Sequence, residues 1–325
     1  MGAAALIAAC APASSSTLAA AGTAPVVVGA HNDDSTPFNL VSVPALAQHE
    51  YDGRGLHLDK VLAREPAWTR YAVSYRSGPL KVTGVMNVPT RPGRHPLVVM
   101  AHGWRNPRLY TSGAMLEREQ AVLAESGFVA FQIDYRNYAE SSLESGRPVA
   151  RPLGYPEDLI NAVRAVKLAR LPFVDSTRIG LFGRSMGGGV VLNALAARPH
   201  LAQAAVLYSP VSSSAADDYQ RWVVRNPSLR RRVVAAYGTP ASRPAFWRQA
   251  SSRTYLERVA VPIQIDHGTA DQMCPLHWSE ATTSALRAAG KDVTLYEYPG
   301  ERHRFDGSWP TFMHRAVTFL RARLG

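Results

Sequence analysis

The sequence is poor in cysteine and in long hydrophobic runs, and each shortage excludes a class of protein. Its 325 residues contain two cysteines, Cys10 and Cys274, too few for a disulfide framework or a four-cysteine zinc site. Its ten histidines form no His-Glu-x-x-His motif, so no metal or other cofactor is expected. Beyond residue 30 there is no strongly apolar, charge-free run of about 18 residues, which excludes a protein with several membrane spans.

Lysine is also scarce, and the positive charge is not arranged for nucleic-acid binding. Lys and Arg total 36 against 25 Asp and Glu, a net charge of +11, and only four of the basic residues are lysines. The arginines are scattered, and their one tight cluster is Arg230–Arg232 with Arg225 nearby. Nucleic-acid-binding proteins usually carry a basic stripe or a recognised motif. We therefore expect a solvated basic surface and no nucleic-acid partner. The excess of Arg in an alanine-rich chain is typical of bacterial proteins.

Residues 1–30 are expected to be a targeting segment outside the folded domain. Residues 2–30 carry no charged side chain, and a short apolar stretch leads into Cys10. Ile7–Cys10 resembles a bacterial lipobox, in which the cysteine is lipidated and the residues after it are a flexible tether. A signal peptide cleaved after Ala30 and an untargeted tail are the open alternatives. We expect an exported protein, either a lipoprotein of the bacterial cell envelope anchored to the membrane or a periplasmic or secreted one.

Residues 31–325 are expected to form one α/β domain, because strand-like and helix-like segments alternate from about Tyr71 onward. Residues 31–70 are read as an N-terminal extension, and residues 211–258 as a small lid or cap insertion. The βα order predicts an eight-stranded, mostly parallel sheet with helices on both faces. The expected strands are Tyr71–Arg76, Leu80–Val88, Pro96–Ala101, Phe128–Asp134, Arg178–Gly183, Ala204–Tyr208, Pro262–Asp266 and Val293–Tyr298. The expected helices are Ala114–Ser126, one that Pro156 opens, Met186–Ala197, Leu276–Ala289 and Thr311–Arg323.

A Gly-x-Ser-x-Gly motif, Gly183–Gly187, lies between an expected strand and an expected helix. In that context the turn is so tight that the residues two before and two after the serine must lack side chains. The strained turn lifts the serine hydroxyl above the sheet and points the helix N-terminus at it. Ser185 is therefore the predicted nucleophile. The spacing differs from Gly-x-Gly-x-x-Gly, which disfavours a dinucleotide site.

A serine nucleophile needs a base, and in this arrangement the chain order is serine, acid, histidine. Asp271 follows the strand that ends near Asp266, and His303 follows the last strand, so both fall on loops at the edge that carries Ser185. His303 would accept the serine proton and return it to the leaving group, and Asp271 would orient the imidazole. Four other residues are less favoured by their positions: Asp217, Asp218, His267 and His314.

The segment after the Pro96–Ala101 strand supplies the remaining parts of the predicted site. A His102-Gly103 pair lets the backbone approach a substrate carbonyl, so the oxyanion hole would use the backbone N–H groups of Trp104 and Met186. Trp104 and Arg184 are the candidate substrate-binding residues. His102 itself is expected to be structural.

These motifs together make the chain from about Tyr71 to Leu324 resemble an α/β-hydrolase of the prolyl oligopeptidase family. The dipeptidyl aminopeptidase and acylaminoacyl peptidase members are the most similar. The resemblance implies the α/β-hydrolase fold, acyl-enzyme catalysis and a triad of Ser185, Asp271 and His303. The motifs that carry it are Thr83–Met86, His102-Gly103, Asp134–Arg136, Gly183–Gly188, Tyr237–Pro240, His267-Gly268 with Asp271 and Pro275, and Gly300–His303.

Two departures from the family bear on the substrate. Many family peptidases carry an N-terminal β-propeller that binds the peptide amine, and we expect none in residues 31–70. The family's Asp-Tyr-Arg-Gly reads Asp134–Asn137 here. We therefore expect a serine hydrolase of small esters or short peptides, with esters preferred because the arginine-rich segment 211–258 suits acidic or neutral substrates. A true aminopeptidase or dipeptidyl peptidase and a catalytically silent binding protein are the alternatives. The sequence does not fix the oligomeric state.

Overall fold

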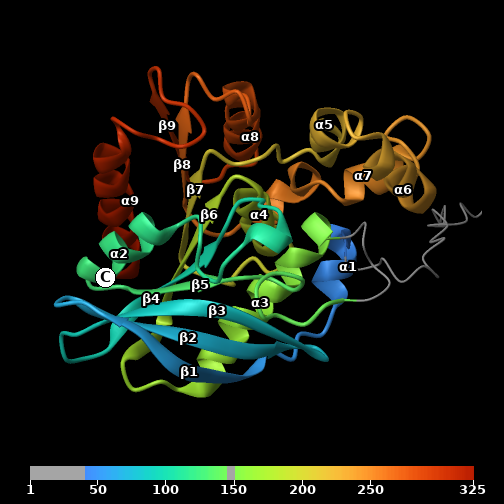
Figure 1. The fold of residues 1–325 in the computed structure, drawn as a ribbon. Coiled ribbons are helices and arrows are strands. Elements are labelled where there is room, and N and C mark those ends of the chain that lie inside the picture. Colours follow the sequence, from blue (N-terminus) through green and yellow to red (C-terminus); the bar gives the residue numbers. More distant parts are fainter. Residues whose placement is uncertain (1–40, 145–150) are drawn as a thin grey trace, which may run out of the picture. The chain divides into compact units, whose positions relative to one another are not determined.

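The computed structural model describes residues 41–144 and 151–325, which are built around one nine-stranded sheet (Figure 1). The strand order is β1-β2-β3-β5-β4-β6-β7-β8-β9. The strands from β5 through β9 in this order pair in parallel, and β1, β2, β3 and β5 pair antiparallel. The strands are β1 Arg54–Arg64, β2 Trp68–Ser77, β3 Leu80–Pro89, β4 His95–Ala101, β5 Val129–Ile133, β6 Val174–Arg184, β7 Ala204–Tyr208, β8 Ile263–Gly268 and β9 Val293–Tyr298.

The expected fold class, a mostly parallel sheet with helices on both faces, is confirmed, but the expected count of eight strands is wrong. The additional strand, β1, lies in the segment read as an N-terminal extension and pairs with β2 through several register shifts. Leu56 is its one fully buried residue, and most of the others are exposed. A strand with one buried side chain lacks the alternation of apolar and polar residues by which strands are recognised.

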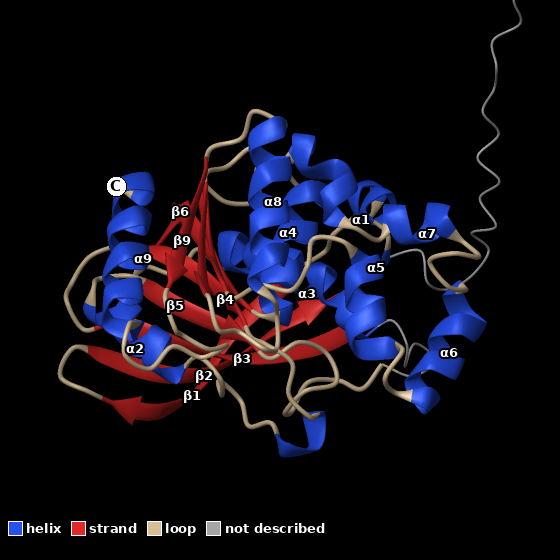
Figure 2. Cartoon of the chain, turned by 90° about the horizontal axis from the view of Figure 1, so that it is seen from above, coloured by secondary structure: helices blue, strands red, loops and turns tan. Residues whose placement is uncertain are grey.

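Helices cover the two faces of the sheet (Figure 2). Residues of α3 (Arg151–Ala169), α4 (Met186–Ala197) and α8 (Leu276–Ala288) contribute to the larger hydrophobic core, on one face. Residues of α2 (Glu117–Glu125) and α9 (Trp309–Leu324) contribute to a second core on the other face. In the described part of the chain, none of the helices combines the length and the apolar character needed to cross a membrane.

One helix start differs from the expectation. Pro156 does not open α3, which begins at Arg151 and contains the proline in its second turn. A proline inside a helix removes one N–H donor and the hydrogen bond that it would make. The buried stripe that follows, which includes Leu159, Val163 and Val166, is fully removed from solvent, and its burial outweighs the loss of one bond.

Residues 211–258 form a helical insertion between β7 and β8 with a small hydrophobic core of its own. Its elements are α5 (Ala215–Asp218), the π-helix η3 (Tyr219–Val223), α6 (Pro227–Tyr237), α7 (Pro244–Gln249) and the 3-10 helix η4 (Ser252–Arg258). The rings of Tyr219 and Trp247 meet at 4.9 Å in this core. In Figure 1, α5, α6 and α7 lie together at the right, on the side of the molecule away from α9. We refer to residues 211–258 as the insertion.

Candidate active site

The turn between β6 and α4 has the strained geometry that its glycines predict. Ser185 lies between the two elements with φ 55° and ψ −120°, a positive φ that side-chain-bearing residues rarely adopt. A Cβ atom on Gly183 would lie 2.4 Å from the carbonyl oxygen of Gly187. A Cβ atom on Gly187 would lie 1.9 Å from the carbonyl oxygen of Ala101, on β4. Both glycines are therefore required for β6, α4 and β4 to approach each other around Ser185.

The loops after β8 and β9 are joined to each other, and this pairing sets the position of His303. The N–H of Ala270 donates to the carbonyl oxygen of Glu301 at 2.9 Å. The Glu301 carboxylate in turn accepts from the backbone N–H groups of Asp306 and Ser308. Glu301 thus ties the segment that carries His303 both to the β8 loop and to the start of α9.

Asp271 and His303 are brought together as the sequence predicts. The Nδ1 atom of His303 lies 2.7 Å from Oδ2 of Asp271, whose side chain is completely buried. The other oxygen, Oδ1, accepts from the backbone N–H groups of Met273 at 2.8 Å and Cys274 at 2.9 Å. Burial alone would raise the pKa of the Asp271 carboxyl, but hydrogen bonds from His267 and His303 and the charge of His303 hold that pKa well below its usual range. Asp271 is therefore an ionised acceptor.

His267 supports the same carboxylate from a second side. Its Nε2 atom lies 2.7 Å from the carbonyl oxygen of Cys274 and 3.2 Å from Oδ2 of Asp271. Both of these atoms are acceptors, so Nε2 must carry the proton. Nδ1 then accepts from the hydroxyl of Ser279 at 2.7 Å. The sequence identifies His267 only as a less favoured base. In the structure it is a fully buried donor to Asp271.

Cys274 contacts Asp271 through its backbone. Its N–H donates to Oδ1 of Asp271, and the nearby Ser185 hydroxyl has a minor, lowering effect on the pKa of its thiol. Burial, reinforced by the negative charge of Asp271, raises the pKa of the thiol, so it stays protonated. Within residues 41–144 and 151–325, no hydrogen bond joins Ser185 to His303. In the structure Asp271 is thus bonded to the imidazole of His303 and to the backbone of Cys274.

The two predicted oxyanion-hole donors lie on segments that flank Ser185. A Cβ atom on Gly103 would lie 3.1 Å from Cβ of Ser185, so the backbone leading to Trp104 passes directly against the serine. Met186 is the first residue of α4, where backbone N–H groups have no acceptor within the helix. The Trp104 side chain is 66% exposed, which leaves it free to contact a substrate.

Arg184, the other candidate substrate-binding residue, is buried in the protein. Its Nη1 donates to the carbonyl oxygen of Met115 at 3.1 Å, and its guanidinium lies 5.3 Å from the ring centroid of Tyr208. Both contacts are made within the fold.

His102 has the structural role expected for it. It is fully buried, its Nδ1 and Nε2 face the carbonyl oxygens of Gly103 and Asp134, and its ring stacks on Tyr110 at 4.5 Å. Burial lowers the pKa of its imidazole, against the opposing effect of the two carbonyl oxygens. His102 therefore fixes the path of the segment that leads to Trp104.

Neither alternative acid contacts His303. Asp217 accepts from the hydroxyl of Ser212, and Asp218 lines a small cavity beside α4. The geometry therefore favours Asp271 over both as the partner of His303.

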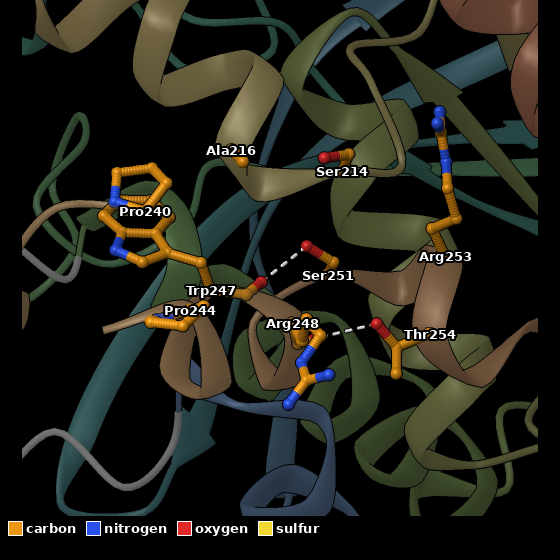
Figure 3. Close-up of a pocket in the computed structure, with 9 residues that line it drawn as sticks. All are labelled: Ser214, Ala216, Pro240, Pro244, Trp247, Arg248, Ser251, Arg253 and Thr254. Atoms are coloured by element: carbon orange, nitrogen blue, oxygen red, sulfur yellow. Dashed lines mark hydrogen bonds between the residues drawn. The ribbon is translucent and has the colours of Figure 1, made fainter. Parts of the chain in front are cut away.

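A cavity of about 360 Å³ is lined by residues of the insertion (Figure 3). One wall is formed by Trp247, Pro240 and Pro244, and Arg253 points away from them. Its lining residues all fall between Ser214 and Thr254 and include no predicted catalytic residue. The smaller cavity, about 60 Å³, has Met186, the residue after Ser185, in its wall. The smaller cavity is therefore the one adjacent to the predicted nucleophile.

Comparisons with known proteins show the family and the fold. The model of the prolyl oligopeptidase family matches residues 114–325. The Bacillus subtilis protein described as uncharacterized peptidase YtmA is 26% identical over 239 residues, which cover 72% of this chain and 86% of that protein. The crystal structure of an acetyl xylan esterase from Paenibacillus sp. R4 superposes with a TM-score of 0.66 at 19% identity, over 89% of this chain and 95% of that one. At that identity the superposition shows the fold alone.

A shorter match is stronger in sequence. An Escherichia coli protein described as an uncharacterized 31.7 kDa protein in the traX-finO intergenic region is 35% identical over 103 residues, 32% of this chain. The chain spans about a third, 33%, of the length of the first curated relatives it matches.

Proposed function

The chain belongs to the prolyl oligopeptidase family of serine hydrolases, and from this premise we propose that it cleaves small esters, and short peptides more slowly, through an acyl-enzyme. Ser185 is the nucleophile, His303 the general base and acid, and Asp271 the carboxylate that orients His303. The observation that carries this proposal is the 2.7 Å bond between Asp271 and His303, on the loops after β8 and β9, together with the strained Ser185 turn after β6.

The first half-reaction acylates Ser185. Its Oγ attacks the substrate carbonyl carbon, and its proton passes to Nε2 of His303, whose Nδ1–H is already held by Asp271. The buried, ionised Asp271 stabilises the imidazolium that forms. His303 then gives the proton to the leaving oxygen or nitrogen as the tetrahedral intermediate collapses. Water repeats the sequence on the acyl-enzyme and releases the acid.

The negative charge that develops on the carbonyl oxygen is met by the N–H groups of Trp104 and Met186. One comes from the backbone that passes against Ser185, and the other from the N-terminus of α4, where the helix dipole adds a partial positive charge. Because both donors are backbone groups in fixed positions, they need no reorganisation during the reaction.

We expect esters to be cleaved faster than amides, because an amide is the harder substrate. Cleavage of an amide requires His303 to protonate a poor leaving group, whereas an activated ester needs much less assistance. The comparisons offer both chemistries, an esterase among the solved structures and a peptidase among the relatives. We therefore expect kcat/KM for short p-nitrophenyl esters to exceed that for aminoacyl or dipeptidyl p-nitroanilides by about 10²-fold or more, which corresponds to about 2.7 kcal/mol.

The decisive test compares wild type with Ser185→Ala. The variant is expected to lose about 10⁶-fold in kcat on p-nitrophenyl acetate, because the members of a triad act as a unit. It should also lose labelling by a fluorophosphonate while keeping its circular dichroism spectrum. Persistent labelling of the variant would refute the assignment of Ser185. Turnover of anilides at rates comparable to esters would instead show that a peptide-binding subsite exists and that the chain is a peptidase.

A further inference from the structure

Most of the large apolar side chains that the described part of the chain exposes follow the carboxyl ends of parallel strands. These are Trp104 and Leu109 after β4, Leu143 after β5, Trp222 and Val224 in the insertion after β7, and Met273 after β8. The strands from β5 through β9 in the sheet order run in one direction, so their carboxyl ends meet at one edge. That edge also carries Ser185. We call these six side chains the apolar rim.

The apolar rim flanks the Ser185 turn from two sides. In the sheet, β4 and β5 lie on one side of β6, and β7 and β8 lie on the other. On the first side, the hydroxyl of Tyr138 donates to the carbonyl oxygen of Arg105 at 3.0 Å, which joins the loops after β5 and β4. On the second side, the guanidinium of Arg221 donates to the carbonyl oxygen of Gln272, which joins η3 to the loop after β8. Loops that are tied together thus present the rim on both sides of the nucleophile.

The side chains of the rim project into solvent and do not enclose a ligand. Leu109 is 66% exposed, Leu143 79% and Met273 50%. None of the six lines either cavity described above. Soluble proteins rarely gather exposed apolar side chains on one face unless that face meets a partner or a membrane. The rim therefore suits a broad apolar surface better than a small molecule.

Exposed arginines accompany the rim on the same edge. They are Arg105 and Arg108 after β4, Arg225 directly after Val224, and Arg302 and Arg304 after β9. None of them forms an ion pair with another described residue. The exposed carboxylates of these loops are fewer: Glu140, Asp306, and Glu117 at the start of α2. The edge thus combines apolar side chains with an excess of positive charge, which is complementary to a surface of anionic lipid.

We propose that this edge docks on a bilayer that contains anionic phospholipid. The apolar rim enters the headgroup region, where Trp and other apolar side chains are stabilised, and the arginines contact the lipid phosphates. Ser185, which lies between the two sides of the rim, then faces the lipid. This inference goes beyond the proposed function, because docking requires no turnover.

The test measures binding to sucrose-loaded vesicles by sedimentation. The full chain carries Cys10→Ser in every sample, so that a lipid anchor at that position cannot contribute. Vesicles of equal parts phosphatidylglycerol and phosphatidylcholine are compared with vesicles of phosphatidylcholine alone. We expect the partition coefficient on the anionic vesicles to be higher by about 10-fold or more, and to fall when the salt concentration is raised from about 0.1 M to about 0.5 M.

The apolar contribution is tested with leucines inside and outside the rim. Leu109→Ser combined with Leu143→Ser is expected to lower the partition coefficient by about 10-fold or more, because two side chains no longer enter the bilayer. Leu62→Ser combined with Leu168→Ser is the matched control. These two leucines are also exposed but lie on β1 and near the end of α3, so this variant should bind like its parent.

The arginines are tested in the same way. Arg108→Gln combined with Arg225→Gln, one change on each side of Ser185, is expected to weaken binding to the anionic vesicles by about fivefold per residue. Binding to phosphatidylcholine alone should not change. Arg164→Gln combined with Arg287→Gln, which alters exposed arginines of α3 and α8, is the matched control and should keep the parent's binding. Circular dichroism confirms that each variant is folded.

Equal binding to the two kinds of vesicle would refute the proposal, as would a loss of binding that is the same in the rim variant and its control. If the parent is a dimer that Leu109→Ser with Leu143→Ser dissociates, and binds no vesicles, the rim pairs with a second copy and the proposal is also wrong. Hydrolysis of soluble p-nitrophenyl acetate is measured on the same samples. An inactive parent that still binds anionic vesicles would refute the proposed function and leave the docking surface standing.

Discussion

The carboxylate of Asp271 is the most constrained side chain of the site, because it accepts four hydrogen bonds. Two come from backbone N–H groups, of Met273 and Cys274, and two from the imidazoles of His303 and His267. An acceptor held on both oxygens cannot rotate, so it presents Oδ2 to His303 in one geometry. The orientation of the general base is thus built into the loop after β8.

We predict that Asp271→Asn lowers kcat by about 10⁴-fold, because the amide presents a donor to Nδ1 and stabilises the wrong tautomer of His303. The measurement is steady-state hydrolysis of p-nitrophenyl acetate. Asp217→Asn is the matched control and is expected to stay near wild type. If Asp217→Asn were the inactive variant and Asp271→Asn the active one, the acid would have to lie after β7.

A second prediction concerns His267, which we propose as a positioning residue. Replacing the donor by an apolar group in His267→Leu leaves the Asp271 carboxylate with one donor fewer, so its charge stabilises protonated His303 more strongly. We expect kcat to fall by about 10-fold with KM unchanged, and the acid limb of the pH–kcat profile to move to higher pH. Ser279→Ala, which no longer fixes the ring through Nδ1, should shift the limb in the same direction by less.

The pH profile separates this role from a merely structural one. A variant of His267 that loses stability and kcat while its acid limb stays in place would show that the residue supports the fold only. His267 is completely buried and contacts no substrate, so a change in KM would argue against the proposal as well.

Among single residues, the sequence predicts those that belong to a recognisable motif. It does not predict those whose role depends only on how the chain packs. Ser185, Asp271 and His303 follow from chain order and from their positions after strands. The donors on the far side of Asp271 carry no such signal, because His267 falls at a strand end and Cys274 in a loop. Asp218 is predicted only as an alternative acid, because its burial depends on tertiary packing that the sequence does not show.

Among the elements, β8 and β9 share a buried carboxyl that titrates near neutrality. Asp266 on β8 bonds the side chain of Gln264 at 2.8 Å and the hydroxyl of Tyr298, on β9, at 2.8 Å. Burial raises the pKa of Asp266 to about 7. The folded state therefore binds this proton more tightly than the unfolded chain, in which an aspartate titrates near pH 4.

The sign of the effect on stability follows from that difference. Between about pH 4 and pH 7 the native state holds more protons than the unfolded state, so the free energy of unfolding falls as pH rises through this window. Asp266→Asn cannot titrate. Relative to wild type, the variant is expected to gain about 2 kcal/mol between pH 5 and pH 8, measured by urea unfolding at both values. An equal difference between the two proteins at both values would show that Asp266 does not titrate between pH 5 and pH 8.

How well the sequence predicts an element depends on how much of that element is buried. The bounds of β7, β9 and α4 agree with the expected ones, because each is an apolar run that ends at a turn or a change of pattern. The exposed β1 gives no such pattern and was missed. The start of α3 was misplaced because a proline, which usually opens a helix, lies inside it.

At the scale of the whole molecule, composition and placement of charge lead to different conclusions. The net charge of +11 and the arginines of the insertion describe a solvated surface. The residues that line the small cavity at Met186 instead include Asp218 and no arginine. The number of charges along a segment therefore predicts how well its surface is solvated. The choice of substrate depends instead on the few side chains that line the binding cavity.

The final prediction concerns the N-terminal segment, and Cys10 lies outside the described residues. We propose that Cys10 is lipidated, on the basis of the lipobox-like Ile7–Cys10 and the charge-free residues around it. One acyl chain holds a protein at a membrane only marginally, but a lipoprotein carries several, which gives firm anchoring.

When the full chain is expressed in a bacterium that processes lipoproteins, wild type is expected in the membrane fraction and Cys10→Ser in the soluble fraction, with equal esterase activity per molecule. Cys274→Ser, which changes the other cysteine, is the matched control for partitioning and should remain with the membranes. Equal partitioning of wild type and Cys10→Ser would refute lipidation, and an N-terminus beginning at His31 in the isolated protein would favour a cleaved signal peptide.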